Sequence, residues 1–312
     1  MNPTTTDHLA SPALSGIRVA APATVGNIAG IKGALACALS LTAVEVIARP
    51  FPCEANDPRI RIHRKPTHAI YPATISDDSA LLKAIDDLLT EAAANENGLK
   101  LLPNIGISLE ILHVAPKAFV QAGCDLGIRE AEIVATLFAV SEYLEHRLPK
   151  RELLPFMELA GGQPDRLAAC LLGSFIFVRA AAPIDAHRLY APALFITLVA
   201  TDAPCATPIH SPAANAAAVV LGLLMGDVGL LSRALADTAA KYATTEPPSL
   251  PFMAVQQAAL AAGALGVGVS SDDCTVFALS KNSLIADAVA AAQATYTPTL
   301  TAKVNDEGVI VK

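Results

Sequence analysis

Two short stretches of this 312-residue chain carry thiols and carboxylates at close spacing. The first stretch holds Cys124 and Asp125, and the second holds Asp272, Asp273 and Cys274. A carboxylate can transfer protons, a thiolate can act as a nucleophile, and the two together can bind a metal ion. The same residues are also ordinary in structural roles, because Asp-rich turns are solvated and a cysteine that opens a strand is usually buried. Both interpretations stay open, and we assign no metal site.

Two further polar residues stand next to apolar stretches. Asn27 follows the Pro-Ala-Thr turn at 22–24, and Asp165 follows Pro164 and opens an apolar run. Asn and Asp are frequent helix caps, because their side-chain oxygens accept bonds from the first N–H groups of a helix. A helix cap is the structural interpretation of each residue, and contact with a small-molecule ligand is the functional one.

The composition indicates a folded protein with a large core. Apolar residues make up 53% of the chain and charged residues 16%, and the mean hydropathy is +0.46. The net charge of −7 argues against a nucleic-acid partner, because phosphate binding needs a basic surface. A short basic run alternates with isoleucines, and we interpret it as the outer face of an edge strand; it consists of Arg59, Arg61, Arg64 and Lys65.

The cellular compartment can be predicted from what the chain lacks. Charged residues interrupt the longest apolar runs, so we predict no membrane span. The six cysteines form no CxxC pair and no metal-finger spacing, and the first residues do not have the pattern of a secretory signal. We therefore expect a cytoplasmic protein with reduced thiols.

Hydrophobic periodicity predicts a mixture of helices and hairpin-like strand pairs, which is typical of an α+β fold and not of a doubly wound sheet. Near the start, a short strand at 17–19 is followed after Asn27 by a helix of small residues and then by a strand that ends at Pro50. Further helices are expected at 79–94, 129–146, 150–159, 213–242, 252–262 and 283–293, and further strands at 60–65, 106–115, 170–180, 193–201, on both sides of 270–275, and as a final pair at 300–304 and 309–311.

Seven segments in this order resemble the homoserine kinases, which are small-molecule kinases of the GHMP superfamily. They are PATVGN (22–27), ISLEILHVAP (107–116), KRELLPFMELAGG (150–162), RLAACLLGSFIFVR (166–179), LMGDVGLLSRALAD (224–237), AALAAGALGVGVS (258–270) and VNDEGVIV (304–311). The resemblance implies a two-lobed α+β fold with ATP and substrate bound between the lobes. The expected division is a disordered tail at 1–16, an N-terminal lobe like ribosomal S5 domain 2 at 17–165, and a ferredoxin-like C-terminal lobe at 166–312.

The resemblance also implies roles for single residues. Asn27 and Asp165 match positions that would serve catalysis. Gly123 and Gly127 stand in the loop that would wrap a triphosphate, and Thr275 matches the third motif of the family. If kinase activity survives, ATP and Mg²⁺ are the implied cofactors, and otherwise the resemblance implies none. A small amino-acid-like molecule is the implied ligand, and a homodimer is a plausible assembly.

The family motifs are degraded around these residues. The glycine-serine loop is replaced by PKAFVQAGCDLGIREAEIV (116–134), in which Asp125 and Glu130 would bring negative charge beside a triphosphate. The third motif reads SSDDCT (270–275), with two acids in place of a Ser-Gly pair. The His-Ala-Asp-Asn segment appears as QPDR (163–166), which keeps only the Asp.

Phosphoryl transfer depends almost wholly on positioning and charge neutralisation around the phosphates. We therefore expect a homoserine-kinase-like protein that has lost ordinary ATP-dependent homoserine phosphorylation and acts as a non-catalytic or repurposed small-molecule-binding relative. One alternative is an active kinase that phosphorylates the hydroxyl of homoserine or a related amino-acid alcohol. A second alternative is a repurposed enzyme that uses the thiols and acids of the two stretches described first, which the family topology would bring to one cleft.

Overall fold

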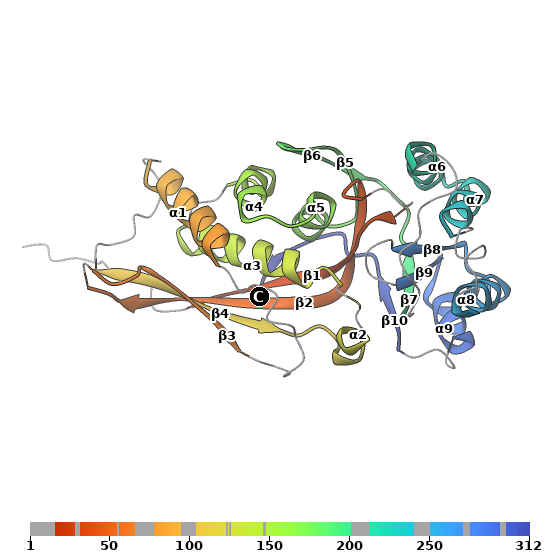
Figure 1. Cartoon of the computed structure of the whole chain (residues 1–312), viewed down its shortest axis with the longest axis horizontal. Helices are drawn as coiled ribbons and strands as arrows, with labels where there is room; N and C mark the ends of the chain where they lie inside the picture. The colour runs from red at the N-terminus through yellow and green to blue at the C-terminus, as the bar shows by residue number, and fades with distance from the viewer. Residues whose placement is uncertain are drawn as a thin grey trace, which may run out of the picture.

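Two β-sheets, each covered by helices on one face, form two lobes that lie side by side (Figure 1). The computed structural model describes residues 16–28, 32–54, 56–65, 78–94, 104–122, 124, 126–145, 148–200, 212–239, 250–270, 275–293 and 298–312. No helix in these ranges is both long and apolar enough to cross a bilayer.

The first sheet is built around one long strand, β2 (Leu35–Pro52). This strand of 18 residues pairs with three neighbours, and its central Val46 lies opposite Val19 on one side and Ile111 on the other. The strand order is β11-β1-β2-β4-β3, and β5 adds to one end of β2 and carries β6. The other strands are β1 (Ile17–Val25), β3 (Ile60–Lys65), β4 (Ile105–His113), β5 (Phe175–Ala181), β6 (Ile184–Leu189) and β11 (Ile310–Val311).

Four helices cover one face of this sheet (Figure 1): α1 (Ser79–Ala94), α3 (Ile128–Tyr143), α4 (Leu154–Ala160) and α5 (Pro164–Leu172). A short helix, α2 (Lys117–Gln121), follows β4, and a 3₁₀ turn, η3 (Lys150–Leu153), precedes α4. Most of α3 is buried, because it packs on β1 and β2 and is covered by α1, α4 and α5. Two glutamates near its start, Glu130 and Glu132, are therefore inside the protein, where a carboxylate needs a specific partner.

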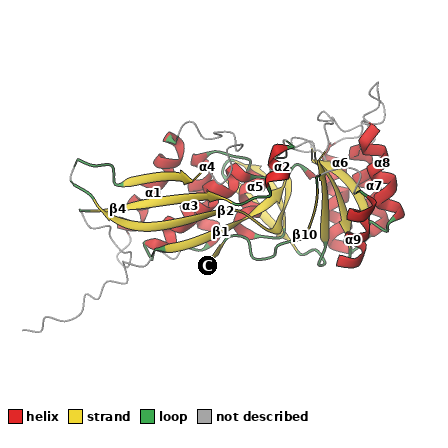
Figure 2. Cartoon of the chain, turned by 90° about the horizontal axis from the view of Figure 1, so that it is seen from below, coloured by secondary structure: helices red, strands yellow, loops and turns green. Residues whose placement is uncertain are grey.

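The second sheet is antiparallel throughout, with strand order β10-β7-β9-β8. Its helices lie on the side that faces away from the first lobe (Figure 2). A separate apolar cluster, which includes Phe252, Val267 and Val276, joins this sheet to its helices. The strands are β7 (Phe195–Ala200), β8 (Gly266–Ser270), β9 (Thr275–Ser280) and β10 (Thr299–Lys303), and the helices are α6 (Pro212–Met225), α7 (Val228–Ala239), α8 (Leu250–Ala261) and α9 (Ser283–Ala292).

The end of the chain returns to the first lobe (Figure 1). Val304 forms a β-bridge with Leu39, and the backbone N–H of Asn305 donates to the carbonyl of Ala38 at 2.9 Å. The final strand β11 then pairs with β1. The two lobes are therefore tied together by the C-terminal segment as well as by the connection between β6 and β7.

The two-lobed α+β architecture agrees with the prediction, but the expected lobe boundary at residue 165 falls inside the first lobe. The elements α5, β5 and β6 follow that residue and still pack with the first sheet, and the second sheet begins only with β7. Residues 1–15 of the expected tail lie outside the described residues.

Three predictions of local structure are wrong. The helix expected after Asn27 is the first part of β2, where Ala36, Cys37 and Ala38 are fully buried in the sheet. The strand expected at 170–180 begins only at Phe175, because α5 continues to Leu172. The last two strands do not pair with each other, since β10 joins β7 and β11 joins β1.

Candidate functional site

Four segments meet where the two lobes join: the end of β1, the start of α3, the start of α5 and the end of β8. The backbone N–H of Thr24 donates to the carbonyl of Leu126 at 2.9 Å, which ties β1 to the residue before the cap of α3. The hydroxyl of Ser270 donates to the carbonyl of Gly26 at 2.8 Å, which ties β8 to β1. We call this region the junction.

Asn27 is completely buried in the junction and links three segments. Its backbone is left-handed, with φ 56°, a conformation that Asn tolerates better than most residues. Its Oδ1 accepts a bond from the N–H of Gly33 at 2.9 Å, and its Nδ2 donates to Oε1 of Gln163 at 3.0 Å. Asn27 therefore closes the turn between β1 and β2 and holds the start of α5.

The carboxyl group of Asp165 is also completely buried. Its Oδ2 accepts a bond from the backbone N–H of Asn27 at 3.1 Å, and its Oδ1 accepts one from the backbone N–H of Arg166 at 3.0 Å. Burial raises the pKa of the Asp165 carboxyl above its ordinary value, and the N–H bonds and the Arg166 charge oppose that rise. The structure thus places Asn27 and Asp165 together, with both side chains inside the protein.

Two glycines of the junction are covered by neighbouring side chains. Gly127 caps α3 in a left-handed conformation with φ 67°, which favours glycine, and a β-carbon there would lie 2.0 Å from Oγ1 of Thr24. A β-carbon on Gly26 would lie 2.4 Å from Nε of Arg166, a side chain that is completely buried. The faces of both glycines are therefore filled by Thr24 and Arg166.

Glu130 lies in the first turn of α3, and its side chain is buried at the junction. Its Oε1 accepts a bond from the backbone N–H of Gln163 at 3.0 Å, which ties α3 to the turn between α4 and α5. Its Oε2 is buried and has no hydrogen-bond partner among the described residues. The covered glycines therefore add a steric objection to a triphosphate beside the expected electrostatic one.

The remaining predicted site residues are divided between the junction, the core and the undescribed parts. Thr275 pairs with Ser270 across β8 and β9, which places it next to the junction. Cys124 lies in the hydrophobic core, where a thiol behaves as a small apolar group. The other predicted residues lie outside the described ranges; they are Gly123, Asp125, Asp272, Asp273 and Cys274.

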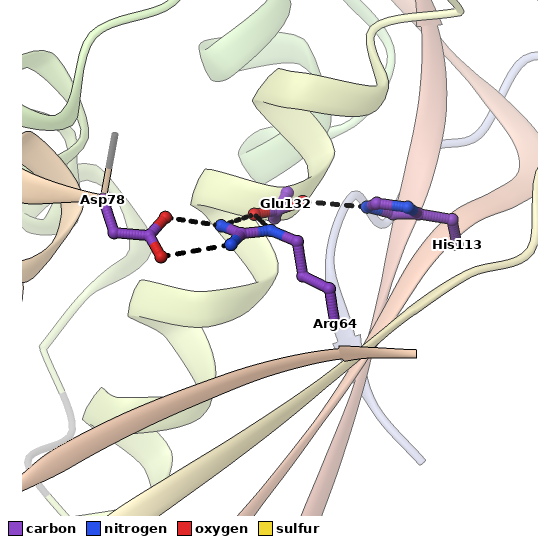
Figure 3. Close-up of polar contacts among 4 residues, drawn as sticks. All are labelled: Arg64, Asp78, His113 and Glu132. Atoms are coloured by element: carbon purple, nitrogen blue, oxygen red, sulfur yellow. Dashed lines mark hydrogen bonds and ion pairs between the residues drawn. The ribbon is translucent and has the colours of Figure 1, made fainter. Parts of the chain in front are cut away.

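A second polar cluster, which is partly buried, lies in the first lobe (Figure 3). Glu132 of α3 accepts bonds from Arg64 at 2.6 Å and lies 2.8 Å from Nε2 of His113. Arg64 also binds both carboxylate oxygens of Asp78, at 2.6 and 3.1 Å. Burial lowers the pKa of the Arg64 guanidinium, but the two carboxylates outweigh this effect and raise the pKa overall. We call these four residues the ion-pair cluster.

The sequence analysis missed this cluster. It predicted β3 correctly as an edge strand, but the side chain of Arg64 points to α3 and not to solvent. It assigned no role to His113. The available signals were a histidine at the end of an apolar alternation in β4 and a glutamate next to the apolar run of α3. Neither signal identifies its partner, because the three elements are far apart in the sequence.

In the described parts of the chain, no group of three or more His, Cys, Asp or Glu side chains is arranged to hold a metal ion. The described residues of the junction offer backbone N–H groups, side-chain amides, the hydroxyls of Thr24 and Ser270, two carboxyl groups and one guanidinium. Such a set can bind a small polar molecule, and its charged members are already in contact with protein atoms.

Comparison with known sequences finds homoserine kinases, although no protein-family model matches the chain. The homoserine kinase of Chlorobaculum tepidum is 32% identical over 189 residues, which are 54% of this chain and 58% of that protein, so the match spans little more than half of the relative. The homoserine kinase of Chloroherpeton thalassium is 29% identical over 308 residues, covering 87% of this chain and 89% of that protein.

Comparison with solved structures extends this likeness over the whole chain. The crystal structure of homoserine kinase from Cytophaga hutchinsonii has a TM-score of 0.73 at 25% identity and covers 98% of this chain and 100% of that chain. The structure of L. major mevalonate kinase has a TM-score of 0.60 at 15% identity, which shows a shared fold alone. These likenesses confirm the predicted two-lobed fold of the GHMP kinases.

Proposed function

Because this chain belongs to the homoserine kinase family, we propose that it is a member that binds a small molecule and has lost ordinary ATP-dependent phosphorylation of homoserine. The observation that supports this proposal is the burial and the hydrogen bonding of the two candidate catalytic residues. Asn27 and Asp165 are completely buried, and they are bonded to each other and to neighbouring segments. The ligand that we propose is small and amino-acid-like.

The proposal follows from what a group that transfers a proton must do. It must come within about 3 Å of the substrate hydroxyl, directly or through one water. Both carboxylate oxygens of Asp165 already accept backbone N–H bonds, and the amide of Asn27 is bonded at both ends. These bonds fix β1 to α5, so the two side chains have the contacts expected of structural residues.

ATP and Mg²⁺ are the cofactors that the family implies, and the described junction does not fit them well. A phosphate loop needs bare glycine backbone, so that the N–H groups can approach the phosphates. Here Thr24 covers Gly127 and Arg166 covers Gly26. We therefore derive no reaction step through a nucleotide.

A second candidate function is an active kinase that acts on the hydroxyl of homoserine or a related amino-acid alcohol. The observation that favours it is Gly127, which keeps a left-handed glycine conformation at the start of α3, as an anion-binding helix terminus requires. The similarity to homoserine kinases over 87% of the chain supports the same alternative. This candidate requires the side chain of Arg166 to move away from Gly26.

The third candidate, a repurposed enzyme that uses thiols and acids, rests on residues that are mostly outside the described ranges. Its one described member, Cys124, is buried. The cytoplasmic compartment and the homodimer stay predictions from the sequence.

The deciding experiment measures ADP release by the full-length protein with ATP, Mg²⁺ and homoserine, together with calorimetric titration of Mg–ATP. We expect no homoserine-dependent ADP release and no saturable heat of nucleotide binding. The matched control is Asp165→Asn, which should behave like the wild-type protein in this assay. Homoserine-dependent ADP release that saturates, and that Asp165→Asn abolishes, would establish the active kinase instead.

A further inference from the structure

The least expected residue of the junction is Arg166, a fully buried arginine in the first turn of α5. Its side chain crosses the face of Gly26, where a β-carbon would lie 2.4, 2.8 and 3.1 Å from Nε, Cγ and Cδ. Its Nη1 reaches Gly127, where a β-carbon would lie 3.7 Å away. One side chain therefore spans the space in front of both glycines.

The position of this guanidinium is unusual because of the helix that starts there. Gly127 caps α3, a helix of 16 residues, and the N-terminus of a helix carries a partial positive charge that favours anions. A cation at this end is held against the helix dipole. The carboxyl group of Asp165 interacts with the Arg166 charge and compensates part of it.

A second group at the same place is also suited to an anion. Oγ1 of Thr24 is completely buried and has no hydrogen-bond partner among the described residues. It lies 2.0 Å from the position of a β-carbon on Gly127, so it points to the start of α3. A helix N-terminus and an unpartnered hydroxyl thus converge on a space that Arg166 already covers.

We propose that Arg166 is a built-in occupant of the anion site at the start of α3, and that its removal is enough for this site to bind a polyphosphate. The inference rests on the proposed function, because Arg166 is one reason why nucleotide is not bound. When Arg166 is removed, Thr24 still lies against Gly127, but its hydroxyl, which can donate to an anion, and the face of Gly26 become accessible.

The test is calorimetric titration of tripolyphosphate into the full-length wild-type protein and into Arg166→Ala. We expect no saturable binding of tripolyphosphate by the wild-type protein. We expect Arg166→Ala to bind tripolyphosphate with a Kd at least about tenfold below the weakest Kd that the titration can detect. Methylguanidinium, which restores the missing group, should compete with tripolyphosphate in the variant. The matched control is Arg129→Ala, which removes an exposed arginine from the first turn of α3 and should bind no tripolyphosphate.

The outcomes separate the two proposals. If the wild-type protein binds tripolyphosphate as tightly as Arg166→Ala does, the inference fails and the proposed function loses its support. If Arg166→Ala is folded by circular dichroism and binds no tripolyphosphate, the inference is overturned and the proposed function stands. If Arg166→Ala does not fold, Arg166→Asn is used in the same titration, and the refolding of Arg166→Ala in methylguanidinium is measured. The inference is overturned if Arg166→Asn binds no tripolyphosphate and methylguanidinium does not restore the fold of Arg166→Ala.

Discussion

Glu130 and Glu132 lie two residues apart in α3, and both are buried, but their carboxylates have different surroundings. Glu132 contacts a guanidinium and an imidazole in the ion-pair cluster. Glu130 accepts one neutral backbone bond, and its second oxygen has no hydrogen-bond partner among the described residues. One side of the start of α3 is therefore fixed by opposite charges, whereas the other side, at the junction, is held by a neutral backbone bond.

This difference distinguishes the ion-pair cluster, which has a structural role, from the junction, which is the candidate ligand site. The ion-pair cluster joins β3, β4 and α3 to the residue before α1, and it has the saturated contacts of a structural network. Among the described residues, the Thr24 hydroxyl and one carboxylate oxygen of Glu130 in the junction have no hydrogen-bond partner, and we expect a small polar ligand there.

Replacing Glu132 should be far more damaging than replacing Glu130. Glu132→Gln removes the charge that Arg64 and His113 share, while Arg64 keeps its bonds to Asp78, so we expect a loss of about 1.5–3 kcal/mol. Glu130→Gln keeps the acceptor for Gln163 and should change stability by less than about 1 kcal/mol. Urea unfolding of both variants measures the two losses, and equal losses would remove the contrast between the two sites.

The structural role of Asn27 predicts a loss of similar size. Asn27→Ala loses the bonds to Gly33 and Gln163 and places alanine at φ 56°, so we expect a loss of about 2–3 kcal/mol. Asn27→Gly loses the same bonds without the backbone strain and should be about 1 kcal/mol more stable than the alanine variant. If thermal unfolding shows both variants to be as stable as the wild-type protein, Asn27 is not the structural link described above.

The pH dependence of stability should have opposite signs at Asp165 and Glu45. The pKa of Asp165 is raised, so its contribution to the free energy of unfolding is present at low pH and is lost as pH rises through the folded-state pKa. Burial alone would raise the pKa of Glu45, but Lys312 and Arg18 outweigh it and lower the pKa, so its contribution is lost as pH falls below about 4.5.

We therefore expect that the stability of Asp165→Asn relative to the wild-type protein improves as pH rises, whereas Glu45→Gln improves relative to wild type as pH falls. Chemical unfolding between pH 3.5 and 7 measures both slopes. Slopes of the same sign for the two variants would show that the burial of Asp165 does not dominate its titration.

The buried thiols should show no effect at all. Burial raises the pKa of the Cys37 thiol to about 12 and raises that of Cys170 as well, and Cys124 lies in the same core. Labelling of the folded protein with a thiol reagent at pH 8, followed by peptide mapping, should leave these three cysteines unmodified. Rapid labelling of Cys124 would instead support the third candidate function, a repurposed enzyme that uses thiols and acids.

Ordered motifs were enough to predict the fold, but not the local structure that carries the junction. The segment LACAL has high helix propensity, and it forms the first residues of β2 because both faces of the strand are buried in the first lobe. Small residues fit there, under α5, whatever their intrinsic preference. The boundary of α5 was missed for a related reason, since the apolar run from Leu167 to Phe175 changes from helix to strand at Gly173.

The site could be predicted in part. The resemblance named Asn27, Asp165 and Gly127 as site residues, and the structure places all three in the junction; their catalytic and binding roles stay predictions. The resemblance could not show that Arg166 lies across Gly26, or that Glu130 accepts a bond from the backbone of Gln163. Both depend on side-chain directions at a place where four segments meet, and a single sequence does not specify them.

The most direct measurement is a crystal structure of the wild-type protein grown with Mg²⁺ and a non-hydrolysable ATP analogue. Our account predicts that Arg166 still lies across Gly26, that Thr24 still covers Gly127, and that no polyphosphate is ordered at the start of α3. A polyphosphate bound to the N–H groups of α3, with Arg166 displaced from Gly26, would contradict it.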